Sequence, residues 1–489
     1  MSKDNKGIIK RIHNLLINKD ISCQELTKKY LEKIEESNLN AYVTVCKELS
    51  LEIAGKVDKK INDGEEISLL EGIPMTLKDN ISTSGIETTC GSKILENYKP
   101  IYNATVWENL KKENAVMLGK TNMDEFAMGS SCETSFIGGA KNPHNSDYVA
   151  GGSSGGVASA VAGNIAAYGL GSDTGGSVRQ PSSFCGVVGL KPTYGAVSRY
   201  GLIAYASSLD QIGPIGKTVE DVSVVFDFIA TYDKKDSTSH PKINFNTQSE
   251  LKKDLKGLKI GIPNQYYEGI DKDIKETLVS AMKVYESMGA KVEYFDLPEI
   301  KYALPVYYIL ACAEASSNLA RFDGVRYGYR AHHYKDINEK ICKTRSEGFG
   351  KEVKRRILLG NYVLSSGYYD AYYKKAQNLR GLIIKAFNEA FNKFDVLLTP
   401  TSPVTAFPQN KSYNSPEEIY LADICTVPVN IAGVPAVSVP CGFDLNKLPI
   451  GMQIIGNKFQ ESKILNAAHQ FEVFTNYAYN KNLDMGVNL

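Results

Sequence analysis

The chain has 489 residues, of which 43% are hydrophobic, enough for one large domain or about two to three smaller ones. Its 56 basic and 55 acidic residues nearly cancel, which excludes a global attraction to nucleic acid or anionic lipid. The sequence shows no signal peptide, no run of roughly 20 apolar residues and no C-x-x-C pair among its nine cysteines. We therefore expect a cytoplasmic protein with reduced thiols, no metal site and no membrane contact.

Two amphipathic helical patterns open the chain. The second begins at Ser22 with a capping box and has its apolar side chains on one face, which predicts a helix packed on the core. Between residues 65 and 215 charged residues become rare, and nine glycines lie between Gly151 and Ser177. Apolar runs interleave with these glycines, so we expect a packed region in which the backbone approaches a ligand or another element closely.

Beyond residue 215, strand and helix patterns alternate. Predicted strands are 259–263, 291–297, 395–401, 435–440 and 451–456, and predicted helices are 273–289 and 374–394. The alternation predicts an α/β fold, with a central mixed or mainly parallel β-sheet covered by helices on both faces. The polar stretch 232–256 is expected to be a surface connection. We expect a single domain over 1–489, with N-terminal helices (1–60), a glycine- and serine-rich catalytic core (65–215) and a remaining α/β part (216–489).

Three short motifs resemble nucleotide-binding or hydrolase motifs. Asn114–Thr121 resembles a phosphate-binding P-loop, but its first glycine is replaced by asparagine, and Gly169–Thr174 lacks the third glycine of a dinucleotide fingerprint. Residues 151–155 satisfy G-x-S-x-G, the nucleophile elbow of α/β-hydrolases, but 142–150 before them is a poor strand. None of the six histidines lies between Gly151 and Ser177, and His332 and the histidine after it are expected on a helix surface. Nucleotide binding and a Ser-His-Asp site remain the weaker alternatives.

Without a histidine, a serine nucleophile needs another base, and a lysine kept neutral by burial is the usual substitute. Lys78 is the candidate because it ends an apolar run, where a solvated lysine is unexpected. The alternative is an ion pair between Lys78 and Asp79. Cys185 lies near the serine motifs but has no histidine nearby in the sequence, so we expect a buried structural thiol.

The two serine motifs and the lysine together resemble the amidase signature family. Residues 151–156 read GGSSGG and residues 171–181 read GSDTGGSVRQP. Ser153 and Ser177 are 24 residues apart, and Lys78 precedes Ser153 by 75 residues, as in the family pattern. The likeness extends over essentially the whole chain. It implies an amidase-signature fold and a Ser-Ser-Lys catalytic triad.

The resemblance implies a role for each of these residues. Ser177 is the nucleophile that attacks the side-chain amide of glutamine, while a neutral Lys78 takes the proton through Ser153 and returns it to the leaving ammonia. A cis peptide bond precedes Ser153 in the family, and Ser154 and Arg179 are expected to be supporting neighbours. The backbone N–H groups expected to bind the oxyanion are those of Thr174, Gly175 and Gly176.

Within the family, the resemblance is to the glutamine-hydrolysing subunits of tRNA-dependent amidotransferases. The stretches that carry it are 123–131, 322–328, 352–360, 365–377 and 423–435. By this resemblance Arg356 binds the α-carboxylate of glutamine and Asp423 binds its α-ammonium group. The further residues implied in substrate binding are Tyr307 (or Tyr308, if the register shifts by one), Gly129 and Ser130.

The same resemblance implies B and C partner subunits in a heterotrimer. This chain would need no cofactor, because the B subunit would use ATP and Mg²⁺ to activate tRNA-linked glutamate or aspartate and would receive ammonia through a channel. Contacts with tRNA would be made mostly by the partner, and the acceptor tRNA stays open. The alternatives are a stand-alone amidase, which has no use for the Arg356–Asp423 pair, and a non-catalytic scaffold, which has no use for the intact triad.

Overall fold

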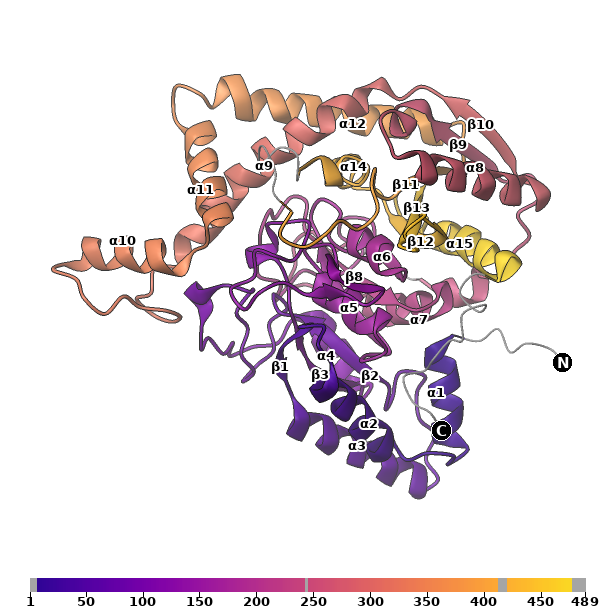
Figure 1. Ribbon diagram of the computed structural model, residues 1–489, viewed down its shortest axis with the longest axis horizontal. Helices are drawn as coiled ribbons and strands as arrows, with labels where there is room; N and C mark the ends of the chain where they lie inside the picture. The colour runs from indigo at the N-terminus through magenta and orange to yellow at the C-terminus, as the bar shows by residue number, and fades with distance from the viewer. Residues whose placement is uncertain (1–6, 242–244, 412–419, 477–489) are drawn as a thin grey trace.

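The computed structural model describes residues 7–241, 245–411 and 420–476 (Figure 1). In this part of the chain an eleven-stranded sheet has the order β1-β3-β2-β6-β8-β7-β12-β13-β11-β9-β10, and β4 and β5 form a separate two-stranded sheet. The strands are β1 (Tyr42–Val45), β2 (Pro74–Lys78), β3 (Val116–Thr121), β4 (Lys141–Asn142), β5 (Asn145–Val149), β6 (Tyr168–Asp173), β7 (Val188–Lys191), β8 (Gln211–Gly216), β9 (Lys259–Pro263), β10 (Lys291–Phe295), β11 (Val396–Pro400), β12 (Ala436–Phe443) and β13 (Pro449–Gly456).

The α-helices extend over nearly the full length of the chain. They are α1 (Ile8–Ile17), α2 (Cys23–Glu36), α3 (Lys47–Asn62), α4 (Thr105–Lys112), α5 (Gly155–Ala162), α6 (Arg179–Cys185), α7 (Val219–Ile229), α8 (Lys272–Ser287), α9 (Ala303–Asn318), α10 (Ile337–Gly348), α11 (Lys351–Leu364), α12 (Lys375–Phe391), α14 (Val427–Ala432) and α15 (Glu461–Thr475). Figure 1 shows α1 to α3 at one end of the molecule, α9, α11 and α12 at the other, and α5 and α6 between them. Among the described helices none is both long and apolar enough to span a membrane.

The large sheet is mixed, as one of the two sequence-based alternatives predicted. Four of its strand pairs are parallel: β2–β3, β2–β6, β9–β10 and β9–β11. The other six pairs in the described sheet are antiparallel, so the expectation of a mainly parallel sheet is wrong. The short connection between β12 and β13 explains part of this result, because neighbouring strands joined by a hairpin must run antiparallel.

Helices cover both faces of the sheet, as predicted. Side chains of successive strand residues point to opposite faces. On β13, a Cβ at Gly451 would lie 2.4 Å from Oγ of Ser183 on α6, whereas a Cβ at Gly456 would lie 2.6 Å from Cγ2 of Ile464 on α15. The main cluster of buried apolar side chains runs from α1 to α15. The division of the chain into three parts stays a prediction.

All seven strands and helices predicted beyond residue 215 are present, and so is the capping box at Ser22. The resemblance of Asn114–Thr121 to a P-loop is misleading, because most of this segment is the buried strand β3. Its lysine, Lys120, donates to the carbonyl of Ile81 at 2.7 Å and to Thr88 Oγ1 at 2.9 Å. A phosphate-binding loop is therefore excluded at this position.

Two local predictions are wrong. Residues 142–150 contain β5, which pairs with β4 in the small sheet. His332 and His333 lie in an irregular, exposed segment before α10 and not on a helix. The stretch 232–256, whose residues 242–244 lie outside the described part, connects α7 to β9 and is mostly exposed or half-buried, as expected, although Asp236 within it is buried and pairs with Arg199 at 3.4 Å.

Candidate active site

Lys78 ends β2, the third strand from one edge of the large sheet, and its side chain is completely buried. Its Nζ lies 2.7 Å from Oγ of Ser153, 2.9 Å from Oγ of Ser154 and 2.9 Å from Oγ of Ser172. Asp79 lies 3.6 Å from Lys120 instead, so the alternative of a Lys78–Asp79 ion pair is wrong. Three hydroxyl groups surround the amine, and no carboxylate of the described residues lies within ion-pair distance of it.

The environment of Lys78 favours its neutral form. Burial lowers the pKa of Lys78 to about 7, although the charges of Asp124 and Asp173 act in the opposite direction. Desolvation disfavours a charged amine, and hydroxyl groups compensate less for that loss than a carboxylate would. At neutral pH a large fraction of Lys78 is therefore an unprotonated amine, which is the form that a general base requires.

Ser153 lies immediately before α5, after a cis peptide bond that joins it to Gly152. The next residue, Ser154, donates its N–H to the carbonyl of Ser177 at 3.1 Å. The side chain of Ser154 accepts from Lys78 and donates to the carbonyl of Ser172 at 3.1 Å, so it is the supporting neighbour that we expected. These contacts bring the two serine motifs and the lysine into one site.

Ser177 lies in the turn between β6 and α6. The other two members of the triad are completely buried, whereas Ser177 is 8% exposed. The carboxylate of Asp173 stabilises the turn by accepting from the N–H of Gly176 at 2.9 Å and from the N–H of Val178 at 3.1 Å. Ser177 is therefore the triad member most accessible to a ligand.

The loop Thr174–Gly176 departs from one expectation. The Gly176 N–H already donates to Asp173, so in this structure it is not available to an oxyanion. Thr174 Oγ1 donates to Asp210 Oδ1 at 2.6 Å, and the carbonyl of Gly175 accepts from Thr426 Oγ1 at 2.6 Å. No hydrogen bond between described residues uses the N–H of Thr174, Gly175 or Ser177, so these are the candidate oxyanion donors.

Arg356, on α11, is almost completely buried among aromatic rings. Its guanidinium carbon lies 5.3 to 5.5 Å from the ring centroids of Tyr205, Tyr308 and Tyr420. Its Nε donates to Oε1 of Glu352 at 2.8 Å, and its Nη1 donates to the hydroxyl of Tyr205 at 2.6 Å. An incoming carboxylate would therefore share the arginine with Glu352.

Asp423 and Ser130, predicted from distant parts of the sequence, contact each other. Asp423 Oδ2 accepts from Ser130 Oγ at 2.6 Å. Burial raises the pKa of Asp423 to about 7, although the Ser130 hydrogen bond and the charge of Arg356 act in the opposite direction. The Asp423 carbonyl accepts from the N–H of Thr426 at 3.1 Å, and the hydroxyl of Thr426 donates to the carbonyl of Gly175 at 2.6 Å. Asp423 therefore lies beside the loop that precedes the nucleophile.

The two candidate tyrosines, Tyr307 and Tyr308, have different neighbours in the structure. A Cβ at Gly175 would lie 2.7 Å from Cζ of Tyr307, so this ring packs against the nucleophile loop. Tyr308 stacks on Tyr420 with ring centroids 4.1 Å apart, next to Arg356. Tyr307 is therefore the tyrosine at the loop before Ser177, and Tyr308 is the one at Arg356.

Gly129 packs against a buried carboxylate that sequence analysis missed. A Cβ at Gly129 would lie 2.4 Å from Cγ of Asp124, and a Cβ at Gly152 would lie 2.0 Å from Asp124 Oδ2. Asp124 Oδ2 also accepts from the N–H of Cys132 at 2.8 Å. Glycine at positions 129 and 152 thus lets two segments approach one carboxylate.

Sequence analysis also missed Ser172 and Gln180. Ser172 supplies the third hydroxyl group on Lys78. Gln180 joins the two sides of the site, because its Oε1 accepts from the N–H of Gly152 at 2.9 Å and its Nε2 donates to the carbonyl of Ser130 at 2.9 Å. Both residues lie inside the motif at 171–181, so the sequence could have pointed to them. The motif does not, however, predict which groups their side chains contact.

Arg179 and Cys185 have the structural roles expected of them. Arg179 is completely buried, and its Nη2 donates to Asp173 Oδ1 at 2.9 Å and to Asn430 Oδ1 at 2.5 Å. Cys185 is completely buried, and burial raises the pKa of its thiol. His144 Nε2 lies 3.0 Å from the backbone carbonyl of Cys185, while the thiol donates to another carbonyl. Cys185 is therefore a buried structural thiol, as expected.

Comparisons with known proteins agree with this site. A family model described as Amidase matches residues 25–465. The chain is 54% identical over 467 residues to a protein of Thermoanaerobacter pseudethanolicus named as the A subunit of glutamyl-tRNA(Gln) amidotransferase, covering 95% of each chain. The crystal structure of a Thermotoga maritima protein of the same name matches with a TM-score of 0.75 at 43% identity, covering 91% of this chain and 90% of that one. A bacterial aryl acylamidase of the amidase signature family matches with a TM-score of 0.85 at 25% identity, covering 99% of both chains. The chain belongs to the amidase signature family.

Proposed function

We propose that the chain is the A subunit of a tRNA-dependent amidotransferase and that it releases ammonia from glutamine. The observation that carries the proposed chemistry is the contact of 2.7 Å between a fully buried Lys78 and Ser153. The assignment to an amidotransferase is supported by 54% identity over 95% of the chain to a protein of that name, against 25% for the aryl acylamidase. A stand-alone amidase acting on another amide is the alternative.

In the proposed mechanism, Ser177 Oγ attacks the carbonyl carbon of the glutamine side-chain amide. The proton of Ser177 moves to Ser153, and the Ser153 proton moves to the neutral Nζ of Lys78. The negative charge of the tetrahedral intermediate falls on an oxygen that the N–H groups of Thr174 and Gly175 would bind. The protonated lysine returns its proton through Ser153 to the nitrogen, the C–N bond breaks, and ammonia leaves. Water then hydrolyses the acyl ester on Ser177 by the same route and forms glutamate.

Arg356 and Asp423 would select glutamine by binding its α-carboxylate and α-ammonium groups. We expect Arg356→Lys to raise the KM for glutamine about 10- to 100-fold with a smaller change in kcat, because lysine does not reproduce a planar charged donor held between three rings. Steady-state kinetics of ammonia release would measure both constants. Arg355→Lys, at the more exposed neighbouring position on α11, is the matched control and should leave KM within about threefold. Equal KM values for the two variants would contradict this assignment of Arg356.

The pKa of Lys78 also predicts how the reaction rate depends on pH. Burial lowers the pKa of Lys78 to about 7, and only the neutral amine accepts a proton. We therefore expect kcat to rise about tenfold per pH unit below the pKa and to level off above it. Asp423, whose pKa burial raises to about 7, would act on KM instead, because its protonation weakens binding of the ammonium group. A kcat that stays constant across this range would show that Lys78 is not the base.

We further infer that B and C subunits complete the enzyme as a heterotrimer and that tRNA is bound mostly by the partner. The relatives' names, which denote one subunit of an amidotransferase, support a multi-subunit complex. The nearly balanced charge of this chain supports a minor role in tRNA contact. In this proposal the chain holds no cofactor, the partner uses ATP and Mg²⁺, and the complex acts in the cytoplasm.

The experiment follows heavy nitrogen from the side-chain amide of glutamine. The protein is purified with its partners retained and given ATP, Mg²⁺ and tRNA charged with glutamate or aspartate. Label in glutaminyl- or asparaginyl-tRNA would support the proposal and identify the acceptor. Hydrolysis of some other amide, with no release of label from glutamine, would establish the stand-alone amidase instead.

A further inference from the structure

Asp210 lies just before β8, is almost completely buried, and accepts hydrogen bonds from three residues. Thr174 Oγ1 donates to Oδ1 at 2.6 Å. The N–H of Tyr205 donates to Oδ2 at 3.0 Å, and the N–H of Ala206 lies 3.1 Å from both oxygens. Every one of these partners is a donor, so the site suits an ionised carboxylate that accepts on both oxygens.

The segment that Asp210 stabilises reaches the proposed glutamine pocket at its other end. The hydroxyl of Tyr205 accepts from Arg356 Nη1 at 2.6 Å. The N–H of Ser208 donates at 2.8 Å to Glu314 on α9, the helix that also carries Tyr307. Residues 205–210 therefore contact the loop before the nucleophile, the helix of Arg356 and the helix of Tyr307.

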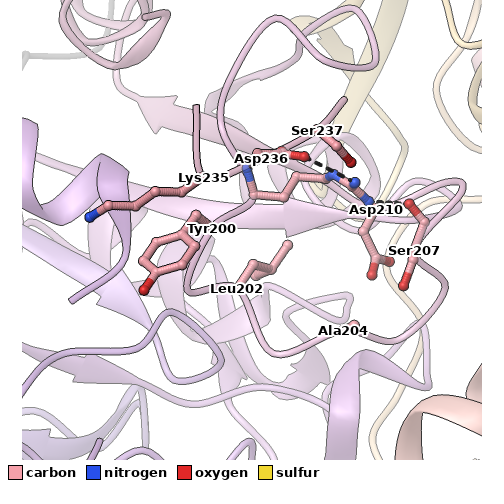
Figure 2. Close-up of a pocket in the computed structure, with 9 residues that line it drawn as sticks. Tyr200, Leu202, Ala204, Ser207, Asp210, Lys235, Asp236 and Ser237 are labelled. Atoms are coloured by element: carbon pink, nitrogen blue, oxygen red, sulfur yellow. Dashed lines mark hydrogen bonds and ion pairs between the residues drawn. The ribbon is translucent and has the colours of Figure 1, made fainter. Parts of the chain in front are cut away.

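The outer side of this segment borders a cavity of about 220 Å³ (Figure 2). Figure 2 shows Ser207 and Asp210 together at one side of it, with Lys235 at the other. The guanidinium of Arg199 donates to the carbonyl of Ser207 and pairs with Asp236. Arg199 thus holds this segment on the side of the cavity, and Tyr205 connects it to Arg356 on the side of the active site.

We propose that Asp210 is a positioning residue for glutamine hydrolysis, which holds Thr174 and the oxyanion loop at a fixed distance from Arg356. The inference rests on the proposed function. Glutamine has a fixed length between its α-carboxylate and its side-chain amide, so the separation of Arg356 from the oxyanion donors decides whether the amide carbon meets Ser177. A misplacement of about 1 Å in such an arrangement can cost about 100-fold in rate.

Two substitutions disrupt the hydrogen bond between Thr174 and Asp210, one at the acceptor and one at the donor. Asp210→Asn keeps the shape but replaces one acceptor oxygen by an NH₂ group, which must then face a donor. Thr174→Val keeps the shape of Thr174 and its backbone N–H but removes the hydroxyl donor. We expect each variant to lower kcat for glutamine about 10- to 100-fold while KM stays within about threefold. The two act through one hydrogen bond, so the double variant should be no slower than the slower single variant.

The test measures kcat and KM for ammonia release by the complex, together with the rate at which phenylmethylsulfonyl fluoride labels Ser177. Lys235→Met, across the same cavity, is the matched control and should leave all three values unchanged. The labelling rate should fall in Asp210→Asn and Thr174→Val, because the reagent also needs the oxyanion donors. Unfolding midpoints of the variants show whether the fold is retained, and Thr174→Val carries the test if Asp210→Asn does not fold.

The inference about Asp210 would be overturned if the losses of kcat in the two single variants multiply in the double variant, or if the substitutions change KM alone. Failure of the proposed function has a different result. In that case the wild-type complex releases no ammonia from glutamine, so the role in glutamine hydrolysis fails with the function. The labelling rate then decides only whether Asp210 positions the oxyanion loop: a fall in both variants supports that, and an unchanged rate overturns it.

Discussion

Replacing Ser177 by alanine is expected to lower glutamine-dependent ammonia release about 10⁴-fold or more. The hydroxyl of Ser177 forms the acyl bond in the proposed mechanism, and no other triad member is as exposed as Ser177, so water would have to attack the bound amide directly. The measurement is ammonia release by the complex at saturating glutamine. Binding of glutamine should persist, because Arg356 and Asp423 are unchanged.

A matched control separates the nucleophile from a general effect of removing a buried serine. Ser182, on α6, is also buried, and its hydroxyl donates to the carbonyl of Val178 at 2.7 Å. Ser182→Ala should keep activity within a few-fold of wild type, since a single neutral hydrogen bond contributes about 1 kcal/mol to stability. Ammonia release that survives Ser177→Ala would remove this serine as the nucleophile and leave Ser153 or Ser154 as the group to test.

Replacing Lys78 by methionine is expected to lower kcat about 10³- to 10⁴-fold, because it removes the base while keeping a side chain of similar length. The remaining activity should no longer rise with pH through the region around 7, where Lys78 titrates in the wild type. Stability should change little, since an apolar side chain avoids the desolvation cost of a buried amine. Kinetics over a range of pH and an unfolding midpoint provide the measurements.

Lys191 is the matched control for Lys78. It is also almost completely buried, and burial, with the charge of Arg179, lowers its pKa to about 7 as well. Its Nζ donates to the carbonyl of Pro192 at 2.8 Å and contacts no triad serine. Lys191→Met should therefore retain activity within about tenfold of wild type and keep its pH dependence. Equal losses in both lysine variants would show that burial of a lysine, and not its contact with Ser153, accounts for the effect.

Much of the fold could be predicted from the sequence because it depends on local patterns. The capping box at Ser22 and the alternating apolar runs beyond residue 215 determine elements within single stretches of about 5 to 20 residues. The spacing of Lys78, Ser153 and Ser177 predicted the triad through its resemblance to a family. Local patterns failed where contacts with distant residues decided the structure. Strand β5 has a weak strand pattern, but Asn142 supports it by donating to the carbonyl of Val149 at 3.1 Å and to that of Phe184 at 2.9 Å.

The sequence by itself thus determined the strands and helices predicted beyond residue 215, the chemical groups of the predicted site and the family. The partner of each group depended on the tertiary structure. Lys78 and Asp79 are neighbours in the chain, yet Lys78 contacts Ser153, 75 residues away, while Asp79 pairs with Lys120. The physical reason is that side-chain direction is set by strand pairing and by the turns before α5 and α6, which join residues far apart in sequence. For the same reason Asp210 and Gln180 became visible only once the chain was folded.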